Sequence, residues 1–474
     1  MDEERWDSMP NPPADEPDEA RSEDFDETID DILAEAEALS DSETPDAPDE
    51  DTLPDEDVLP DEDAIEPSDF PNEGEYPPDS DEAPPTVLRR TPRKPRPTAH
   101  KVLHGLLIAG KWVLAVVLVL AILVGGGIGY LTLTEYTPAY AEAAQYGAFN
   151  TDKKLTTNTL RILTFNTGYA GLDADADFFM DGGSGVKPDS VETVERNMSG
   201  IERILKDSDA DVLLLQEVDT DAARTFEKNQ WLQYEHALSD YESRFALNYS
   251  CNYVPYPLKE PIGKIHSGIA TYSRYDLAAM RQDDPDDLTK YTRVSSTRYS
   301  LPCPFSWPTR VANLKRCLLV TRIPLDGKAK ELVIVNLHLE AYDDGEGKRA
   351  QTEQLMELLT QEYAKGNYVI AGGDFNQSFP EATEEYRIRD GEKWQPGTLE
   401  ELPTDWQYAY DLTTPSCRLL NRPYSPASSE TQYYVIDGYI VSPNVQVDTV
   451  QTLDEGFEYS DHNPVLLEIT LKDE

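Results

Sequence analysis

The sequence predicts an α/β fold for residues 155–474, a layered sandwich with mixed β-sheets, preceded by one transmembrane helix and a disordered acidic tail. Three observations predict this organisation. Strand-like and helix-like runs alternate after residue 155, residues 112–133 carry no charge, and residues 1–88 are rich in acidic residues and proline. The chain of 474 residues has 91 acidic against 41 basic residues and a net charge of −50. That balance excludes a histone-like binder of bare nucleic acid, which needs basic residues to neutralise phosphates.

The acidic tail, residues 1–88, contains 35 acidic residues, two basic residues and 14 prolines. Such a segment cannot bury enough apolar surface to offset its conformational entropy, so we expect a disordered, Pro-rich cytoplasmic tail. Residues 28–39 are the exception, because their apolar side chains fall at helical spacing. Two interpretations stay open for them: a transient helix without a partner, or a helix that docks on a cytoplasmic partner.

Residues 112–134 are predicted to form a transmembrane helix. The 22 residues from Trp112 to Leu133 lack charge, and about 20 apolar residues cross a bilayer core. The juxtamembrane segment 89–111 contains seven basic and no acidic residues. Basic residues beside a span stay in the cytoplasm, so the N-terminus is expected inside. The expected protein is single-pass in the cell membrane, with its C-terminal domain outside the cytoplasm.

A linker, residues 135–154, is expected to follow the span. Within it, Ala139, Tyr140 and Ala141 have the small-x-small form of a signal-peptidase site. Cleavage after Ala141 would release the C-terminal domain, and this alternative stays open. An uncleaved membrane span is favoured, because the apolar run is longer than the core of a usual signal peptide and about 100 residues precede it.

All four cysteines lie after the span, at Cys251, Cys303, Cys317 and Cys417. An even number of cysteines outside the cytoplasm permits two disulfides with three pairings. Free buried thiols are the alternative, since a domain of this size does not need covalent staples. No pair has metal-binding spacing, so a cysteine-based metal site is not expected.

The elements of residues 155–474 follow from hydrophobic periodicity. Residues 190–209 have helical spacing, and the amphipathic run 348–366 ends at Gly366, a residue that favours a helix C-terminus. Strands are predicted at TLRILTFN, DVLLLQEV, GIATYSR, KRCLLVTRIP, ELVIVNLHL, YVIAGGDFN, YVIDGYIVS and PVLLEITL. Three Pro- and Tyr-rich stretches are expected to be long loops: 250–266, 281–310 and 380–432.

Polar side chains recur where these apolar strands stop. One such residue alone is usually a turn residue or a helix cap, but this number in one domain favours a shared cleft at the ends of the sheets. They are Asn166, Glu217, His338, Asp374, Asn376, Asp437, Asp461 and His462. Carboxylate and amide oxygens suit a hard cation such as Mg²⁺ or Mn²⁺. The residue types therefore fit phosphoester hydrolysis.

The ordered motifs resemble the endonuclease/exonuclease/phosphatase superfamily, which includes type I deoxyribonuclease and neutral sphingomyelinases. The resemblance covers about residues 158–472, and its most specific parts are GGDFN at Asp374 and SDHNPV at Asp461. LLLQEVD at Glu217 is weak on its own. NTGYAG, SGIATYSR, VNLHLE and VIDGYIVS also match. The resemblance implies a four-layered α/β sandwich, in which helices flank two mixed β-sheets.

The resemblance further implies a metal site. Glu217 would be the main ligand, with Asn166 beside it and Asp461 assisting, and the metal would be Mg²⁺ or Mn²⁺. The expected enzyme is therefore a divalent-metal-dependent phosphoester hydrolase, a phosphodiesterase or phosphatase.

Five further residues have catalytic roles by the same resemblance. Asp437 would orient His462, which would contact the scissile phosphate. Asp374 would position or deprotonate the attacking water, and Asn376 would donate to the transition-state oxygens. His338 would bind the phosphate or protonate the leaving oxygen.

The sequence leaves the phosphoester substrate open. A phospholipid headgroup is slightly favoured, because the domain is tethered to a membrane and Phe305 and Trp307 are of the type that settles at bilayer interfaces. Packing of these two side chains within a loop is the alternative. A nuclease acting on extracellular DNA or RNA is the second hypothesis, and a catalytically inactive sensor of a phosphorylated ligand is the third. Oligomeric state is not predicted.

Overall fold

The computed structural model describes residues 99–277, 296–325, 330–343, 345–392 and 394–473. The expected acidic tail, including the helical stretch at 28–39, lies outside the described residues.

Helix α2 (Ala99–Leu133) begins well before Trp112 and ends at Leu133. Within the described part of the chain, its stretch Leu103–Leu133 is the one helix long and apolar enough to cross a membrane, with a mean hydropathy of 2.7. None of its most apolar stretch is buried against protein. Length and composition are thus those of a membrane span.

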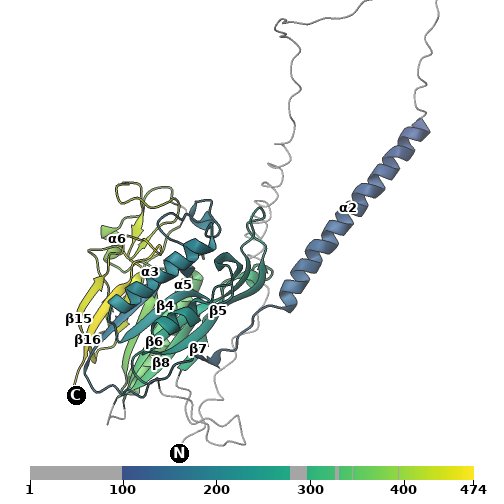
Figure 1. The fold of residues 1–474 in the computed structure, drawn as a ribbon. Coiled ribbons are helices and arrows are strands. Elements are labelled where there is room, and N and C mark those ends of the chain that lie inside the picture. Colours follow the sequence, from purple (N-terminus) through teal and green to yellow (C-terminus); the bar gives the residue numbers. More distant parts are fainter. Residues whose placement is uncertain (1–98, 278–295, 326–329, 344, 393, 474) are drawn as a thin grey trace, which may run out of the picture. The chain divides into compact units, whose positions relative to one another are not determined.

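Two seven-stranded mixed sheets form the folded domain (Figure 1). The first sheet contains, in spatial order, β1 (Ala141–Ala143), β7 (Ser296–Ser300), β8 (Cys317–Pro324), β9 (Glu331–His338), β10 (Tyr368–Asp374), β14 (Asp437–Val441) and β11 (Gln407–Ala409). The second contains β15 (Val445–Thr452), β16 (Val465–Leu471), β3 (Thr159–Asn166), β4 (Val212–Asp219), β6 (Gly263–Ser273), β5 (Glu242–Val254) and β2 (Gln145–Tyr146). Parallel pairs occur at β3–β4 and β9–β10, and the other ladders are antiparallel.

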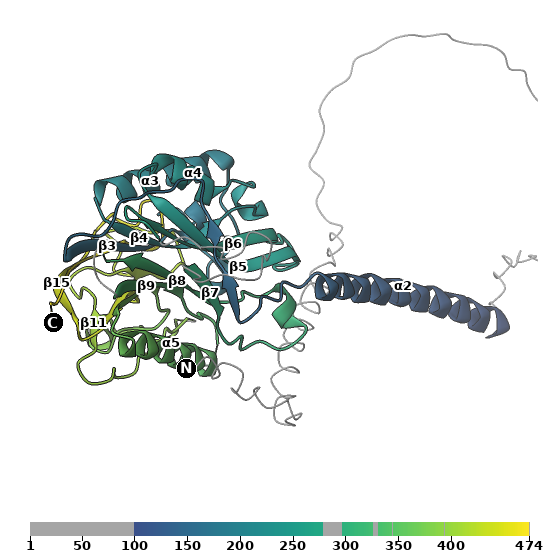
Figure 2. The same ribbon diagram turned by 90° about the horizontal axis from the view of Figure 1, so that it is seen from below.

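Helices cover the outer face of each sheet (Figure 2). Along β3, Ile162 packs between the sheets while Leu163 packs under α3 (Val191–Asp207) and α4 (Gln230–Ala237), because successive strand residues point to opposite faces. On the first sheet, Val333 packs under α5 (Glu346–Ala364). The result is helix, sheet, sheet, helix, which confirms the predicted four-layered sandwich.

Shorter elements complete the domain. They are η2 (Gly168–Ala170), η3 (Phe179–Asp181), η4 (Ala223–Thr225), η5 (Thr309–Ala312), α6 (Ala382–Glu385), and a two-stranded ribbon of β12 (Cys417–Arg418) and β13 (Tyr433–Tyr434).

The two predicted helices have the expected ends. Ser190 precedes α3 and its hydroxyl accepts a hydrogen bond from the Thr193 amide, which is an N-cap. Gly366 follows α5 with a φ of +88°, the left-handed conformation that glycine adopts without a steric penalty. The expectation of a loop over 250–266 is wrong at both ends, where Cys251 and Ile265 pack in a small core and extend β5 and β6.

The segment after the span joins both sheets. β1 pairs with β7 at the edge of the first sheet, and β2 pairs with β5 at the edge of the second. Ala144, which lies between β1 and β2, is buried. Residues 141–146 therefore belong to the folded domain and close one edge of each sheet.

The four cysteines are all free thiols. Cys251, Cys317 and Cys417 are buried, and Cys303 is partly exposed. Of the two alternatives left open by the sequence, the structure has free thiols.

Candidate active site

Five strands and one connection bring the eight predicted site residues to one end of the two sheets. Asp374 at the end of β10 is paired with His338 on β9 and with Asp437 on β14, so these three lie side by side in the first sheet. Asn166 ends β3 and Glu217 lies in β4 of the second sheet. The β15–β16 connection supplies Asp461 and His462, and Asn376 follows β10.

The Asn166 amide links the two sheets at the centre of the site. Its Nδ2 donates to Asp374 Oδ2 at 3.0 Å and lies 3.4 Å from Glu217 Oε1 and 3.5 Å from His462 Nε2. His338 Nε2 lies 3.4 Å from Asp374 Oδ2. The predicted residues thus form one connected cluster.

His462 and Asp437 form a buried pair. His462 Nδ1 lies 2.8 Å from Asp437 Oδ2, and the Ser416 hydroxyl donates to the same oxygen at 2.7 Å. Burial disfavours the charged ring, but the nearby Asp437 and Asp461 outweigh it and raise the pKa of His462 well above its usual value. His462 is therefore a positively charged imidazolium at neutral pH, with its Nε2 directed toward Asp374 and Asp461.

His338 has the opposite electrostatic character. Burial, and then the charges of Arg316 and His462, hold the pKa of His338 well below its usual value, so the ring is neutral. Arg316 is itself buried, and its Nε and Nη1 make no hydrogen bond. Its nearest ionic partner is Glu340, with 3.8 Å between Arg316 Nε and Glu340 Oε2. A buried guanidinium beside the candidate site, with two nitrogens that make no hydrogen bond, can hold an anion.

The carboxylates of the cluster carry an excess of negative charge. Burial, with repulsion from Asp437, raises the pKa of Asp374 to about 6. Burial, with repulsion from Glu217, raises the pKa of Asp461 to about 7, and burial also raises the pKa of Glu217. These oxygens, with the Asn166 amide oxygen, are hard donors that fit a divalent cation, which would offset their repulsion.

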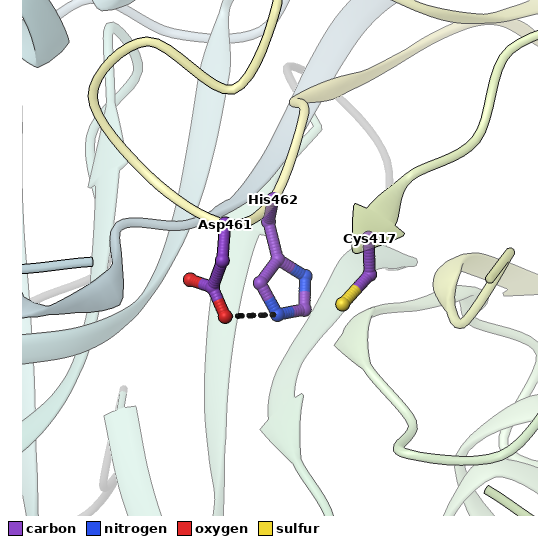
Figure 3. Close-up of side chains that lie close together, drawn as sticks. All are labelled: Cys417, Asp461 and His462. Carbon is purple, nitrogen blue, oxygen red and sulfur yellow. Dashed lines mark ion pairs between the residues drawn. The ribbon is translucent and has the colours of Figure 1, made fainter. Parts of the chain in front are cut away.

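Cys417 lies beside the site but does not extend its chemistry. The His462 ring lies between the Asp461 carboxylate and the Cys417 thiol (Figure 3). Burial raises the pKa of Cys417 to about 12, so the sulfur stays a neutral thiol near pH 7. It packs against the imidazolium rather than acting as a nucleophile.

Two site residues have unusual backbone conformations. Glu217 has a φ of +55° at a bulge where the pairing of β4 with β6 shifts register. Asn376 has a φ of +50°, and its side-chain amide donates to the Leu339 carbonyl at 3.0 Å. Non-glycine residues in the left-handed region cost free energy and concentrate at functional sites. At this bulge the Glu217 side chain is 25% exposed, whereas the side chains of Asp374 and His462 are 2% and 6% exposed.

Asp181 and Tyr342, which the sequence did not reveal, lie beside the cluster, where the charge of Glu217 acts on both, and are here termed the rim of the site. The Tyr342 hydroxyl donates to Asp181 Oδ1 at 3.1 Å, joining η3 to the segment after β9. Burial raises the pKa of Asp181 to about 6. Beside the cluster, Tyr169 lines a pocket of about 180 Å³ whose wall is mainly acidic. The charged residues of this wall are Asp173, Asp175, Asp177, Asp189, Lys187 and Arg196.

The sequence also gave no means of singling out Arg316 and Ser416 as neighbours of the cluster. Arg316 is one of several basic residues near β8, and only the fold shows that it is buried against His338. Ser416 lies in a loop without periodicity, and its contact with Asp437 is set by the pairing of β12 with β13.

Comparison with known proteins gives a family. The sequence model of the "Endonuclease/Exonuclease/phosphatase family" matches residues 163–462. Among solved structures, the endonuclease/exonuclease/phosphatase from Beutenbergia cavernae is 17% identical, covers 66% of this chain and 72% of its own, and has a TM-score of 0.45. TDP2 from Caenorhabditis elegans is 16% identical, with coverages of 67% and 77% and a TM-score of 0.37. The human nocturnin catalytic domain is 17% identical, with coverages of 69% and 98% and a TM-score of 0.38. No curated protein sequence matches this chain.

Proposed function

Because the chain belongs to the endonuclease/exonuclease/phosphatase family, we propose that it is a membrane-anchored, divalent-metal-dependent phosphoester hydrolase that acts outside the cytoplasm on a phospholipid headgroup. One observation supports the assignment as a hydrolase. A charged His462, held by Asp437 at 2.8 Å, lies in the same cluster as a neutral His338 and the Asp374 carboxylate. These are the groups that phosphoester hydrolysis needs to bind a phosphate, activate a water and release an alcohol.

The proposed role of each site residue follows from its charge and its hydrogen-bonding groups. The His462 imidazolium contacts the scissile phosphate, since Asp437 and Ser416 fix its orientation. Asp374, with a pKa of about 6, is ionised at neutral pH and accepts the proton of the attacking water. Neutral His338 donates a hydrogen bond to the phosphate or the leaving oxygen, and Asn376 contributes to the binding of the transition-state oxygens.

Glu217, Asn166 and Asp461 would hold the metal ion, Mg²⁺ or Mn²⁺. When bound, this cation supplies positive charge that neutralises the phosphate and the leaving group. Burial raises the pKa of both Glu217 and Asp461, and a bound cation would offset the cost of keeping these buried carboxylates ionised, which supports the assignment.

The charge of the domain favours a small headgroup over nucleic acid. The pocket beside Tyr169 has four aspartates against one lysine and one arginine. A polynucleotide that extends beyond the cleft would be repelled within a screening length of about 10 Å. A single headgroup phosphate would reach the metal site without crossing that surface.

The substrate class is tested with the full chain in detergent and Mg²⁺ or Mn²⁺. Plasmid DNA, RNA, sphingomyelin and phospholipid vesicles, and bis-p-nitrophenyl phosphate are assayed side by side, with Asp374→Ala as the inactive control. Lipid turnover without nucleic acid cleavage is the expected result. Cleavage of DNA or RNA would make the protein a surface nuclease, and no turnover by metal-loaded folded protein would leave the sensor as the better hypothesis.

The topology is tested separately by protease treatment of intact cells. We expect digestion of residues 135–474 and protection of the acidic tail, since the basic segment 89–111 should keep the N-terminus inside. The reverse pattern would overturn the orientation. Release of a soluble domain beginning after Ala141 would show the processing alternative instead.

A further inference from the structure

The folded domain begins almost where the apolar helix ends. α2 ends at Leu133, and the nearly buried side chain of Glu135 forms ion pairs with Arg310 and Lys315, each at 3.0 Å. The Tyr136 hydroxyl then donates to the Leu247 carbonyl. Two residues of chain reach about 7 Å at most. The domain surface around Arg310 therefore lies within that chain length of the end of the span.

Two loops next to this surface expose large apolar side chains. Trp307 is 54% exposed, and its Nε1 donates to the Thr132 hydroxyl at 3.0 Å. Near the end of β5, Tyr253 is 47% exposed, and in the β5–β6 connection Tyr256 is 52% and Leu258 75% exposed. These four side chains, Tyr253, Tyr256, Leu258 and Trp307, are here termed the interfacial surface. Tyrosine and tryptophan are the residues that favour the headgroup level of a bilayer.

The interfacial surface is connected to the rim of the site. The ring of Tyr256 packs edge-on against Phe179, with 5.5 Å between centroids. Phe179 begins η3, whose last residue, Asp181, accepts the hydrogen bond from Tyr342 at the rim of the site. An ion pair between Lys187 and Glu260, at 3.0 Å, makes a second connection from the β5–β6 loop to the segment after η3.

We propose that the interfacial surface rests in the headgroup layer of the same membrane that α2 spans, and holds the rim of the site against it. The substrate class that follows is a phosphoester in the headgroup of a phospholipid in that bilayer. This inference rests on the membrane anchoring of the proposed function. A bilayer is the partner of the interfacial surface, because the apolar helix of 31 residues ends two residues before the ion pairs of Glu135.

The position of Trp307 is tested in the full-length protein reconstituted in phosphatidylcholine vesicles. Tryptophan fluorescence is quenched with lipids brominated near the headgroup, and the difference between wild type and Trp307→Phe isolates the Trp307 signal from that of the other five tryptophans, which include Trp112 in α2. The expected result is that the Trp307 component is quenched. A Trp307 component that brominated lipid leaves unchanged would overturn the interfacial surface whatever the enzyme hydrolyses.

The link to the substrate is tested with a triple variant, Tyr253→Ser, Leu258→Ser and Trp307→Ser. We expect at least a tenfold loss of turnover on vesicle lipid and less than a twofold change on bis-p-nitrophenyl phosphate. Leu232→Ser is the matched control, because Leu232 is 43% exposed on α4 and should change neither rate. Equal losses on both substrates would refute the link. Quenching of Trp307 without turnover of any phosphoester would support the surface and refute the proposed hydrolase alone.

Discussion

Asp437 is the residue whose charge has the largest expected effect on the catalytic histidine. Its Oδ2 lies 2.8 Å from His462 Nδ1, and both side chains are almost fully buried. In Asp437→Asn, an amide oxygen in the place of Oδ2 can still accept hydrogen bonds from both the Ser416 hydroxyl and His462 Nδ1, but the residue no longer carries a negative charge. Without that charge the buried imidazolium loses its main electrostatic stabilisation and gives up a proton. The neutral ring no longer carries the positive charge that binds phosphate in the proposed mechanism.

The magnitude follows from the distance. Two unit charges 2.8 Å apart attract by about 6 kcal/mol at an effective dielectric constant of about 20, which is an upper limit because the asparagine retains a dipole. Loss of about 4–5 kcal/mol of transition-state stabilisation corresponds to a rate reduced about 10³- to 10⁴-fold. A similar reduction accompanies the same change in a serine-protease triad.

The assay is kcat/KM on bis-p-nitrophenyl phosphate from pH 5 to 9, with Asp448→Asn on the exposed part of β15 as the control. The pKa of His462 should fall toward its ordinary value, so the charged ring is lost at lower pH and activity declines earlier on the alkaline side. Thermal unfolding should show that the variant is folded. A folded variant that keeps more than a third of wild-type activity would refute the role given to this pair.

Three further predictions concern the metal and the fold. A chelator should abolish turnover, and Mg²⁺ or Mn²⁺ should restore it; activity that survives chelation would remove the metal from the mechanism. Glu362, bound by Arg322 at 2.7 Å, has a pKa lowered to about 2 because its ion pairs outweigh burial. The stabilisation from this ionised carboxylate is fully present above about pH 4.5 and disappears as the pH falls toward 2. Glu362→Gln should therefore lower the free energy of unfolding by about 2 kcal/mol at pH 7 and change it little at pH 2. Equal urea midpoints for the wild type and the variant at pH 7 would contradict this. In Gly373→Ala, the Cβ would lie 2.0 Å from the Leu337 carbonyl oxygen at a φ of +154°, so we expect a loss of about 2–4 kcal/mol, and an unchanged melting temperature would contradict the clash.

The strand ends could be predicted because the hydrophobic pattern shows where a buried strand stops. Asn166, Asp374 and Asp437 follow apolar runs directly, and the ladder of β9, β10 and β14 then brings the last two into register. The fold class followed from the same pattern together with the family motifs. Asn376 was predicted as a site residue, and its side chain is held by the Leu339 carbonyl.

Residues whose role depends on tertiary contacts could not be predicted. Arg316 directly precedes β8 and Arg322 lies within it, and the sequence does not distinguish them. One is buried without a hydrogen bond for its Nε and Nη1, whereas the other pairs with Glu362. The strands β1 and β2 were also missed, because Ala141–Ala143 and Gln145–Tyr146 have little intrinsic strand preference and pair only when the sheet edges are present.

In the proposed membrane-anchored protein, the short strands β1 and β2 have a consequence for neighbouring copies. Confinement to two dimensions raises the rate at which anchored domains meet, and an unpaired sheet edge is a template for joining two chains. One six-residue segment, from Ala141 to Tyr146, occupies one edge of each sheet, with strands of three and two residues. So short an outer strand offers an approaching chain few free amide and carbonyl groups. In the proposed membrane-anchored protein, the segment that follows α2 thereby also limits edge-to-edge pairing at these two positions.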